Sequence, residues 1–126
     1  MKVLNVVRSA FRTLVEEQDD TILWLSQCLQ RAGADLELLL EGQACHYACL
    51  GTPQPALAIG SWRQEHPADP RADIERMRQA GMALFVLEED LAARGLDASR
   101  LQSGVTVLGR DRLPALYANA DLVWHW

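Results

Sequence analysis

Five short strand-like runs alternate with helix-like segments along the 126 residues of this chain. The runs are Lys2–Val7, Asp35–Leu40, Met82–Leu87, Val105–Leu108 and Asp121–Trp126. The first and third are almost continuously apolar, which is typical of strands covered on both faces. Strands that alternate with helices form a parallel sheet with right-handed crossovers. The sequence therefore predicts an α/β fold, and its length fits a single domain, residues 1–126.

The segments between these runs carry helix start and stop signals. Asp69 followed by Pro70 is a helix start, and Gly81 supplies the corresponding stop. The further predicted helices run from about Thr13 to Gly33, from Glu88 to Arg94 and from about Asp111 to Asn119. In the first of these, an apolar stripe is expected at Ile22, Leu25 and Leu29. Helices are thus expected on both faces of the sheet.

One long connection, Gly51–Asp69, has no helical or strand pattern and contains three prolines and Trp62. Connections of this length in compact domains are usually lids, interface loops or mobile segments. We therefore expect this segment to cover something. One hypothesis is that a small ligand binds beneath it, with Trp62 as a wall of the site.

A ligand site in a doubly wound sheet lies beyond the carboxyl ends of the strands, where the strand order reverses. With the order 2-1-3-4-5, that point lies between the first and third strands. It would bring Arg8 and Ser9 close to Glu88 and Glu89, flanked by residues 42–49. Arg8 and Ser9 would then bind an anion such as a phosphate or a persulfide terminus. Equally, Arg8 would pair with Glu88 or Glu89.

Composition excludes several classes of function. The net charge is −5 and no basic run is present, which predicts no direct contact with nucleic acid. Lys2 is the only lysine, so no lysine is available inside the fold for a Schiff base or a phosphate loop. No apolar run is long enough for a membrane span and the N-terminus lacks a signal-peptide pattern, which predicts a cytoplasmic protein without membrane contact. No cofactor is predicted.

The three cysteines are Cys28, Cys45 and Cys49, and in a reducing compartment they are expected to be thiols. Cys45 and Cys49 are one helical turn apart. If a helix starts near Gly42, its dipole would lower the pKa of the Cys45 thiol, with His46 as a nearby base or cation. Alternatively, both cysteines are small buried apolar residues. Their spacing with His46 matches no zinc motif, so no metal is predicted.

Two further groups have a functional and a structural interpretation. The acidic run that starts at Glu88 has the residue types for magnesium binding or acid–base chemistry. The structural interpretation is favoured, because acids stabilise the N-terminus of a helix and Asp90 is placed to pair with Arg94 one turn later. Trp124 and Trp126 share a face of the last strand. They are expected either to pack on the domain's own helices or to form part of a subunit interface.

Residues 84–96, LFVLEEDLAARGL, resemble the strand-three signature of the DsrE/DsrF/DsrH (TusD/TusC/TusB) sulfur-relay family. The resemblance is greatest to the DsrH/TusB branch, whose members carry a similar Asn-Glu-Asp-Leu-x-Ala-Arg-Gly-Leu string. The tail, residues 120–126 (ADLVWHW), resembles the family's closing strand with its terminal aromatic residue. The resemblance implies a flavodoxin-like five-stranded fold, assembly into trimers or hexamers, and transfer of persulfide sulfur.

Catalytic members of that family place a cysteine at the end of strand three, and the corresponding residue here is Leu87. The resemblance therefore implies an accessory member without the sulfur-carrying thiol. Such a protein would act as a subunit of a homo-oligomer, as a subunit beside related DsrE/DsrF-like chains, or as a docking partner for a sulfur-carrier protein. The alternative hypothesis is a persulfide carrier that uses Cys45.

Overall fold

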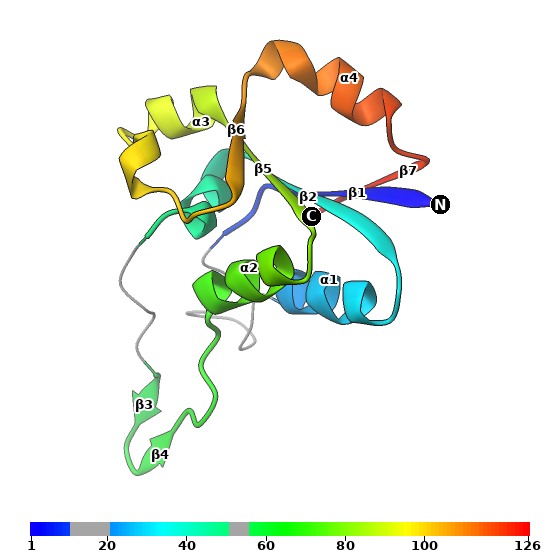
Figure 1. Ribbon diagram of the computed structural model, residues 1–126. Coiled ribbons are helices and arrows are strands. Elements are labelled where there is room, and N and C mark those ends of the chain that lie inside the picture. The colour runs from blue at the N-terminus through cyan, green and yellow to red at the C-terminus, as the bar shows by residue number, and fades with distance from the viewer. Residues whose placement is uncertain (11–20, 51–55) are drawn as a thin grey trace.

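The computed structural model describes residues 1–10, 21–50 and 56–126, and its centre is a five-stranded parallel sheet (Figure 1). The strands are β1 (Lys2–Val7), β2 (Asp35–Leu40), β5 (Ala83–Leu87), β6 (Val105–Leu108) and β7 (Leu122–His125). Each coincides with a predicted run, with differences of one residue at some ends. The predicted α/β class and parallel sheet are confirmed.

The strand order is β6-β5-β2-β1-β7. Numbered as the five predicted runs, this order is 4-3-2-1-5, so the predicted order 2-1-3-4-5 is wrong. β2 is an interior strand, paired with β1 on one side and with β5 on the other. Its sequence explains this position, because the consecutive residues Leu38, Leu39 and Leu40 are all fully buried. Successive residues of a strand point to opposite faces, so such a run is buried only when both faces are covered. The strand order consequently reverses between β1 and β7.

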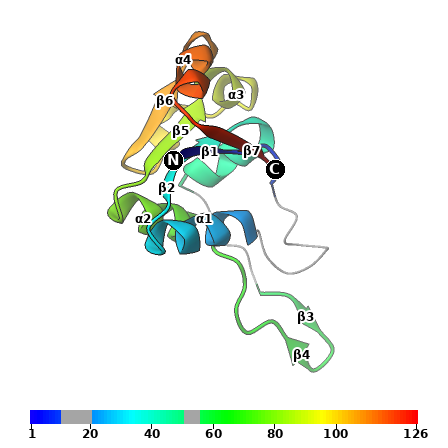
Figure 2. The ribbon, with the colours of Figure 1, turned by 90° about the vertical axis from the view of Figure 1, so that its right-hand side faces the viewer.

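Helices cover both faces of the sheet, as predicted (Figures 1 and 2). The α-helices are α1 (Thr21–Arg31), α2 (Pro70–Gln79), α3 (Glu88–Ala93) and α4 (Leu113–Ala118), and the 3₁₀ helices are η2 (Gly42–Ala48), η3 (Ala98–Arg100) and η4 (Arg110–Arg112). α1 and α2 lie side by side on one face, and α4 lies on the other. The larger core lies on the α1–α2 face. A smaller core, here called the α4-face cluster, consists of Leu4, Val6, Leu39 and Leu87, with Phe85, Leu113, Leu116, Tyr117, Ala120 and Val123 packed against it.

The helix predicted from Asp69 to Gly81 is confirmed as α2. The Asp69 carboxylate accepts a hydrogen bond from the Ala72 amide over 3.0 Å and thus caps the helix. Ile74 and Met77 face the core and are fully buried. Gly81 ends the helix with a φ of 85°, a left-handed conformation that glycine adopts without strain.

The first predicted helix is confirmed only in its second half, since residues 11–20 lie outside the described part of the chain. The predicted stripe at Ile22, Leu25 and Leu29 is half-buried, and Ile22 and Leu29 pack against the larger core. The most deeply buried positions of the helix are Leu23, Ser26 and Gln27. Two of these are polar, and an apolar pattern therefore did not mark them. The burial of Ser26 is tolerated because its hydroxyl accepts a hydrogen bond from Asn5 and donates one to the Ile22 carbonyl.

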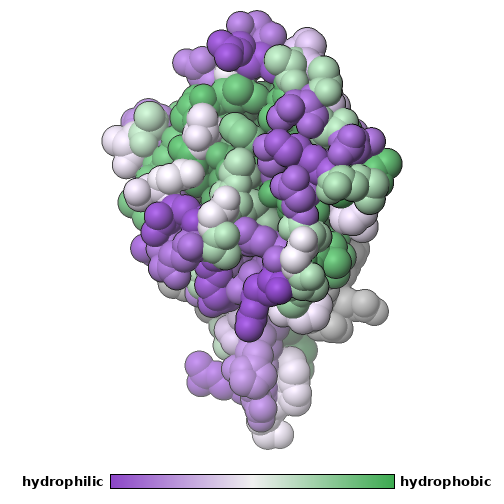
Figure 3. Space-filling view, turned by 45° about the vertical axis from the view of Figure 1, so that its right-hand side comes forward, coloured by the Kyte–Doolittle hydropathy of each residue, from purple (hydrophilic) through white to green (hydrophobic). Residues whose placement is uncertain are grey.

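A two-stranded hairpin, β3 (Ala58–Ile59) and β4 (Trp62–Arg63), projects from the domain (Figures 1 and 3). Its side chains do not cover the core: Ile59 is 65% exposed and Trp62 is 55% exposed. Within the single chain, the hairpin of residues 58–63 therefore does not cover the core, and residues 51–55 lie outside the described part. The expectation that Gly51–Asp69 covers a ligand or a partner stays a prediction. Across residues 1–10, 21–50 and 56–126, no helix has the length and apolar character that a membrane crossing requires.

Candidate functional site

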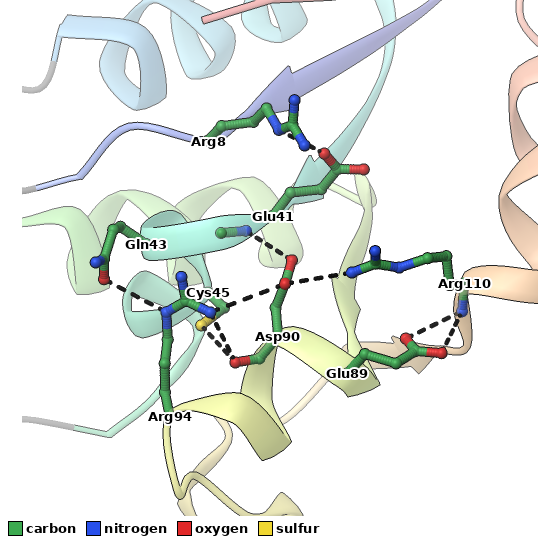
Figure 4. A network of polar contacts seen from close by, with 9 residues as sticks. Arg8, Glu41, Gln43, Cys45, Glu89, Asp90, Arg94 and Arg110 are labelled. Carbon is green, nitrogen blue, oxygen red and sulfur yellow. Dashed lines mark hydrogen bonds and ion pairs between the residues drawn. The ribbon is translucent and has the colours of Figure 1, made fainter.

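Asp90, in the first turn of α3, is the centre of a polar network at the carboxyl edge of the sheet (Figure 4). One carboxylate oxygen accepts a hydrogen bond from the Gly42 amide over 2.7 Å. The other lies 3.8 Å from Arg94 Nη1 and 3.5 Å from Arg110 Nη2. The predicted pairing of Asp90 with Arg94 is confirmed. Asp90 thereby links the starts of η2 and η4 to α3, and these segments follow three different strands.

Further contacts reinforce the same edge. Both carboxylate oxygens of Glu89 accept the backbone N–H of Arg110, at 3.0 and 3.1 Å. This donation lowers the pKa of Glu89, because a hydrogen bond to the ionised form favours it. Arg94 donates to the Asp90 carbonyl over 3.1 Å and to Gln43 Oε1 over 3.4 Å. These contacts between acids, arginines and backbone groups therefore hold together the segments that follow β2, β5 and β6.

Arg8 pairs with Glu41, which was not among the predicted partners. Its Nε lies 2.9 Å from Glu41 Oε2 (Figure 4). The prediction that Arg8 and Ser9 meet Glu88 and Glu89 is wrong, because β2 lies between β1 and β5. Val7 aligns with Leu40 in the sheet, so the residue opposite Arg8 is the one that follows β2.

Leu87 is the last residue of β5, where the family resemblance places the sulfur-carrying cysteine. Its side chain is 2% exposed and belongs to the α4-face cluster. A leucine side chain has no atom that can attack sulfur or bind a metal. This position is therefore part of the core.

Cys45, on η2, and Cys49, the residue that follows η2, lie in the core and not at the molecular surface. Cys45 is fully buried, and its Sγ lies 3.8 Å from the Asp90 carbonyl. Burial raises the pKa of the Cys45 thiol to about 11, although the Arg94 charge acts in the opposite direction. The expected lowering by a helix dipole is wrong, because the loss of hydration in the core outweighs the field of a short 3₁₀ helix.

Cys49 resembles Cys45 in its surroundings. Its Sγ lies 3.7 Å from the Cys45 carbonyl, and burial raises its pKa. The Nδ1 atom of His46 lies 2.9 Å from the Gln43 carbonyl, and Cys28 is a half-buried free thiol on α1. No group of three or more His, Cys, Asp or Glu side chains that could hold a metal occurs among the described residues.

The three tryptophans that the sequence singled out lie in three different environments. Trp124 packs against the larger core, in agreement with the expectation that it contacts the domain's own helices. Trp126 is 43% exposed, and its indole N–H donates to Asn5 Oδ1 over 2.6 Å. Trp62 remains on the hairpin, where it lines an open surface pocket with its sequence neighbours Ser61, Arg63, Gln64 and Glu65.

Sequence reasoning missed Tyr117 and His125. Their rings stack with centroids 6.2 Å apart and an angle of 22° between the planes. The pKa of Tyr117 is raised by burial and further by the Glu41 charge, and the Arg8 charge opposes this. The tyrosine therefore lies within electrostatic range of the Arg8–Glu41 pair. His125 lies between the two tryptophans that share a face of the last strand, so alternation places it on the other face. Only the observed strand order places it beside β1.

Comparison with known proteins identifies the fold. No family model matches the sequence, and no curated protein sequence matches it significantly. A solved structure, that of the ychN protein from E. coli, is similar with a TM-score of 0.73 and 17% sequence identity. The similarity covers 99% of this chain and 98% of that chain. The chain has a DsrE-like fold.

The DsrE-like fold confirms the architecture that the family resemblance implied. At 17% identity the similarity to ychN shows the fold alone. Within this fold the carboxyl edge carries the Asp90 network, the Arg8–Glu41 pair and the buried Leu87. The function of that edge follows from its chemistry.

Proposed function

We propose that this chain is a non-catalytic, accessory member of the DsrE/DsrF/DsrH-like sulfur-relay proteins. It would act in intracellular sulfur transfer as an oligomer subunit or as a docking partner of a sulfur carrier. The DsrE-like fold supports the family, and one observation carries the accessory role. Leu87 fills the position at the end of β5 where the family resemblance places the working thiol.

The surroundings of Leu87 support a role without sulfur chemistry. The side chain is almost completely buried under α4, next to Leu4, Val6 and Leu39. Neither a sulfur donor nor a sulfur acceptor has a nucleophile to reach there. A persulfide carrier needs a thiolate, because the thiol form is a poor nucleophile.

A carrier role for Cys45 is disfavoured by the same requirement. With a pKa of about 11 and full burial, Cys45 is a thiol at neutral pH and does not face solvent. Its Sγ lies against the Asp90 carbonyl. Loading of Cys45 would require opening of the contacts between η2 and α3. The accessory role requires no such opening.

The exposed apolar side chains support assembly with other chains. Leu57, Ile59 and Trp62 are 47%, 65% and 55% exposed on the projecting hairpin and its approach. Hydrophobic surface is also visible on the body of the domain above the hairpin (Figure 3). Clustered apolar side chains on a protein surface often mark an interaction site. A two-stranded hairpin is itself only marginally stable in water without further packing.

Native purification tests this proposal. The tagged full chain is isolated from its own cells under non-denaturing conditions, and the mass of the intact assembly is measured. A homo-oligomer or a stoichiometric complex with DsrE/DsrF-like chains is expected. The double variant Ile59→Ser, Trp62→Ala should weaken that assembly, whereas Arg71→Gln, an exposed arginine on α2, serves as the control. A wild-type chain that remains monomeric and partnerless contradicts the proposal.

A further inference from the structure

The strand order reverses between β1 and β7, and this reversal is the point where α/β sheets bind ligands. The ladders continue past the strand ends there. The Glu41 amide donates to the Val7 carbonyl over 2.9 Å, and the Arg8 amide donates to the Trp126 carbonyl over 3.0 Å. The alternation of side chains therefore extends to Arg8 and Glu41.

That alternation places three polar residues on the α4 side of the sheet. Arg8, Glu41 and His125 each stand two positions beyond a residue that packs in the α4-face cluster, and these residues are Val6, Leu39 and Val123. Val6 aligns with His125 on one side and with Leu39 on the other. Arg8 and Glu41 thus continue the apolar rows of that face past the carboxyl ends of β1 and β2, and His125 lies one row earlier, beside Val6 at the end of β7.

Arg8 is held there by a buried partner. The Glu41 side chain is 7% exposed and takes the Nε edge of the guanidinium, whereas the Arg8 side chain is 67% exposed. A guanidinium has five N–H donors in a fixed fork. Within the described part of the chain, Arg8 forms an ion pair with Glu41 alone, which orients the group and leaves most of it facing water.

Tyr117 and His125 complete the cluster from α4 and from the end of β7. Their stacked rings hold each other in place. His125 is exposed and Tyr117 is half-buried. The Tyr117 hydroxyl has an O–H and the His125 ring has an N–H, and each can donate a hydrogen bond to an anion.

We propose that Arg8, Tyr117 and His125 bind a small oxyanion at this reversal point, with Glu41 as the residue that positions Arg8. The fork of an arginine matches the oxygens of a phosphate, a sulfur oxyanion or a carboxylate, and charge-assisted hydrogen bonds of this kind are strong. Tyr117 and His125 supply donors from a second and a third segment. The site goes beyond the accessory role proposed above and does not depend on it.

A titration followed by NMR tests this site on the full, ¹⁵N-labelled chain. Inorganic phosphate, thiosulfate and acetate are added separately, and the amide signals of Arg8, Ser9 and His125 are observed. Saturable shifts confined to these signals are expected, and the anion that binds most tightly distinguishes a phosphorus, sulfur or carboxylate oxyanion. The absence of a saturable shift with all three anions overturns the proposal.

Substitutions identify the residues that bind. Arg8→Gln should weaken binding about tenfold, the cost of losing a charge-assisted hydrogen bond. Arg63→Gln removes an equal charge from the exposed hairpin and should leave the affinity unchanged. Equal affinities in these two variants would overturn the site.

A second pair of variants keeps the test decisive if Arg8→Gln does not fold. Tyr117→Phe removes only a hydroxyl, and His125→Gln removes the ring, so neither leaves the Glu41 carboxylate without its partner. Each should weaken binding several-fold. Wild-type affinity in both variants contradicts the proposal.

Discussion

Asp90 accepts a hydrogen bond from the backbone amide of Gly42 over 2.7 Å, and this contact joins two segments that are 48 residues apart in the chain. Gly42 begins η2 after β2, and Asp90 lies in the first turn of α3 after β5. Arg94 and Arg110 approach the other carboxylate oxygen. The same carboxylate therefore holds the carboxyl edge of the sheet in one arrangement.

Asp90→Asn should lower the free energy of unfolding by about 1–3 kcal/mol, because a part-buried hydrogen bond and two arginine contacts lose their charged acceptor. Urea denaturation measures the change. Glu65→Gln, which alters an exposed carboxylate near the hairpin, is the control and should stay within about 0.5 kcal/mol of wild type. Similar losses in both variants would show that Asp90 does not organise this edge.

The raised pKa of Cys45 predicts a loss of stability at alkaline pH. The folded chain keeps a thiol proton up to about pH 11, whereas an ordinary thiol releases it near 9.0. Between these two values the folded chain holds a proton that the unfolded chain has lost. The contribution of Cys45 to the free energy of unfolding is therefore fully present below pH 9.0 and is lost as the pH rises toward 11. Urea denaturation on either side of pH 9.0 measures the decline. Cys45→Ala should show a smaller decline, and an identical pH dependence would contradict the assignment.

Asn5 is predicted to hold the end of the chain to the sheet. Its side chain donates to Ser26 Oγ over 2.6 Å and accepts from the Trp126 indole over 2.6 Å, and it is 3% exposed. Asn5→Ala removes both hydrogen bonds and leaves the groups of Ser26 and Trp126 without this partner, so a loss of about 1–3 kcal/mol in unfolding free energy is expected. The Trp126 indole N–H should also exchange faster with solvent. Asn119→Ala, at an exposed asparagine, is the control; unchanged indole exchange in Asn5→Ala would refute this role.

The sequence predicted the elements of the fold because their signals are local. The apolar runs located the strands, and Asp69, Pro70 and Gly81 located α2. Strand order is a long-range property that periodicity does not report. One local signal was present: the consecutive leucines of β2 indicate an interior strand. The error in strand order moved the predicted site from the β1–β7 reversal point to a place that β2 occupies.

The candidate site was predictable only in part. The Asp90–Arg94 pair follows from helical spacing, and Leu87 follows from the family resemblance. The partner of Arg8 depends on strand register, which placed Glu41 opposite it. The state of Cys45 depends on burial beneath α3, and spacing along the chain contains no information on burial.

Trp62 tests whether the hairpin packs on the folded core. Because its side chain is 55% exposed, Trp62→Ala should change the free energy of unfolding by no more than about 0.5 kcal/mol. Thermal or urea denaturation of the isolated chain measures this value. A loss of several kcal/mol would show that the hairpin packs on the domain in solution.

Sulfur loading tests the central claim that this edge carries no sulfur. The reduced chain, with the half-buried Cys28 changed to Ser, is incubated with a persulfide donor, and its intact mass is measured beside a DsrE-family carrier that has the strand-three cysteine. We predict that the carrier gains the mass of a sulfur atom and that this chain does not. A gain in this chain that disappears in Cys45→Ser would contradict the accessory role and establish Cys45 as a sulfur carrier.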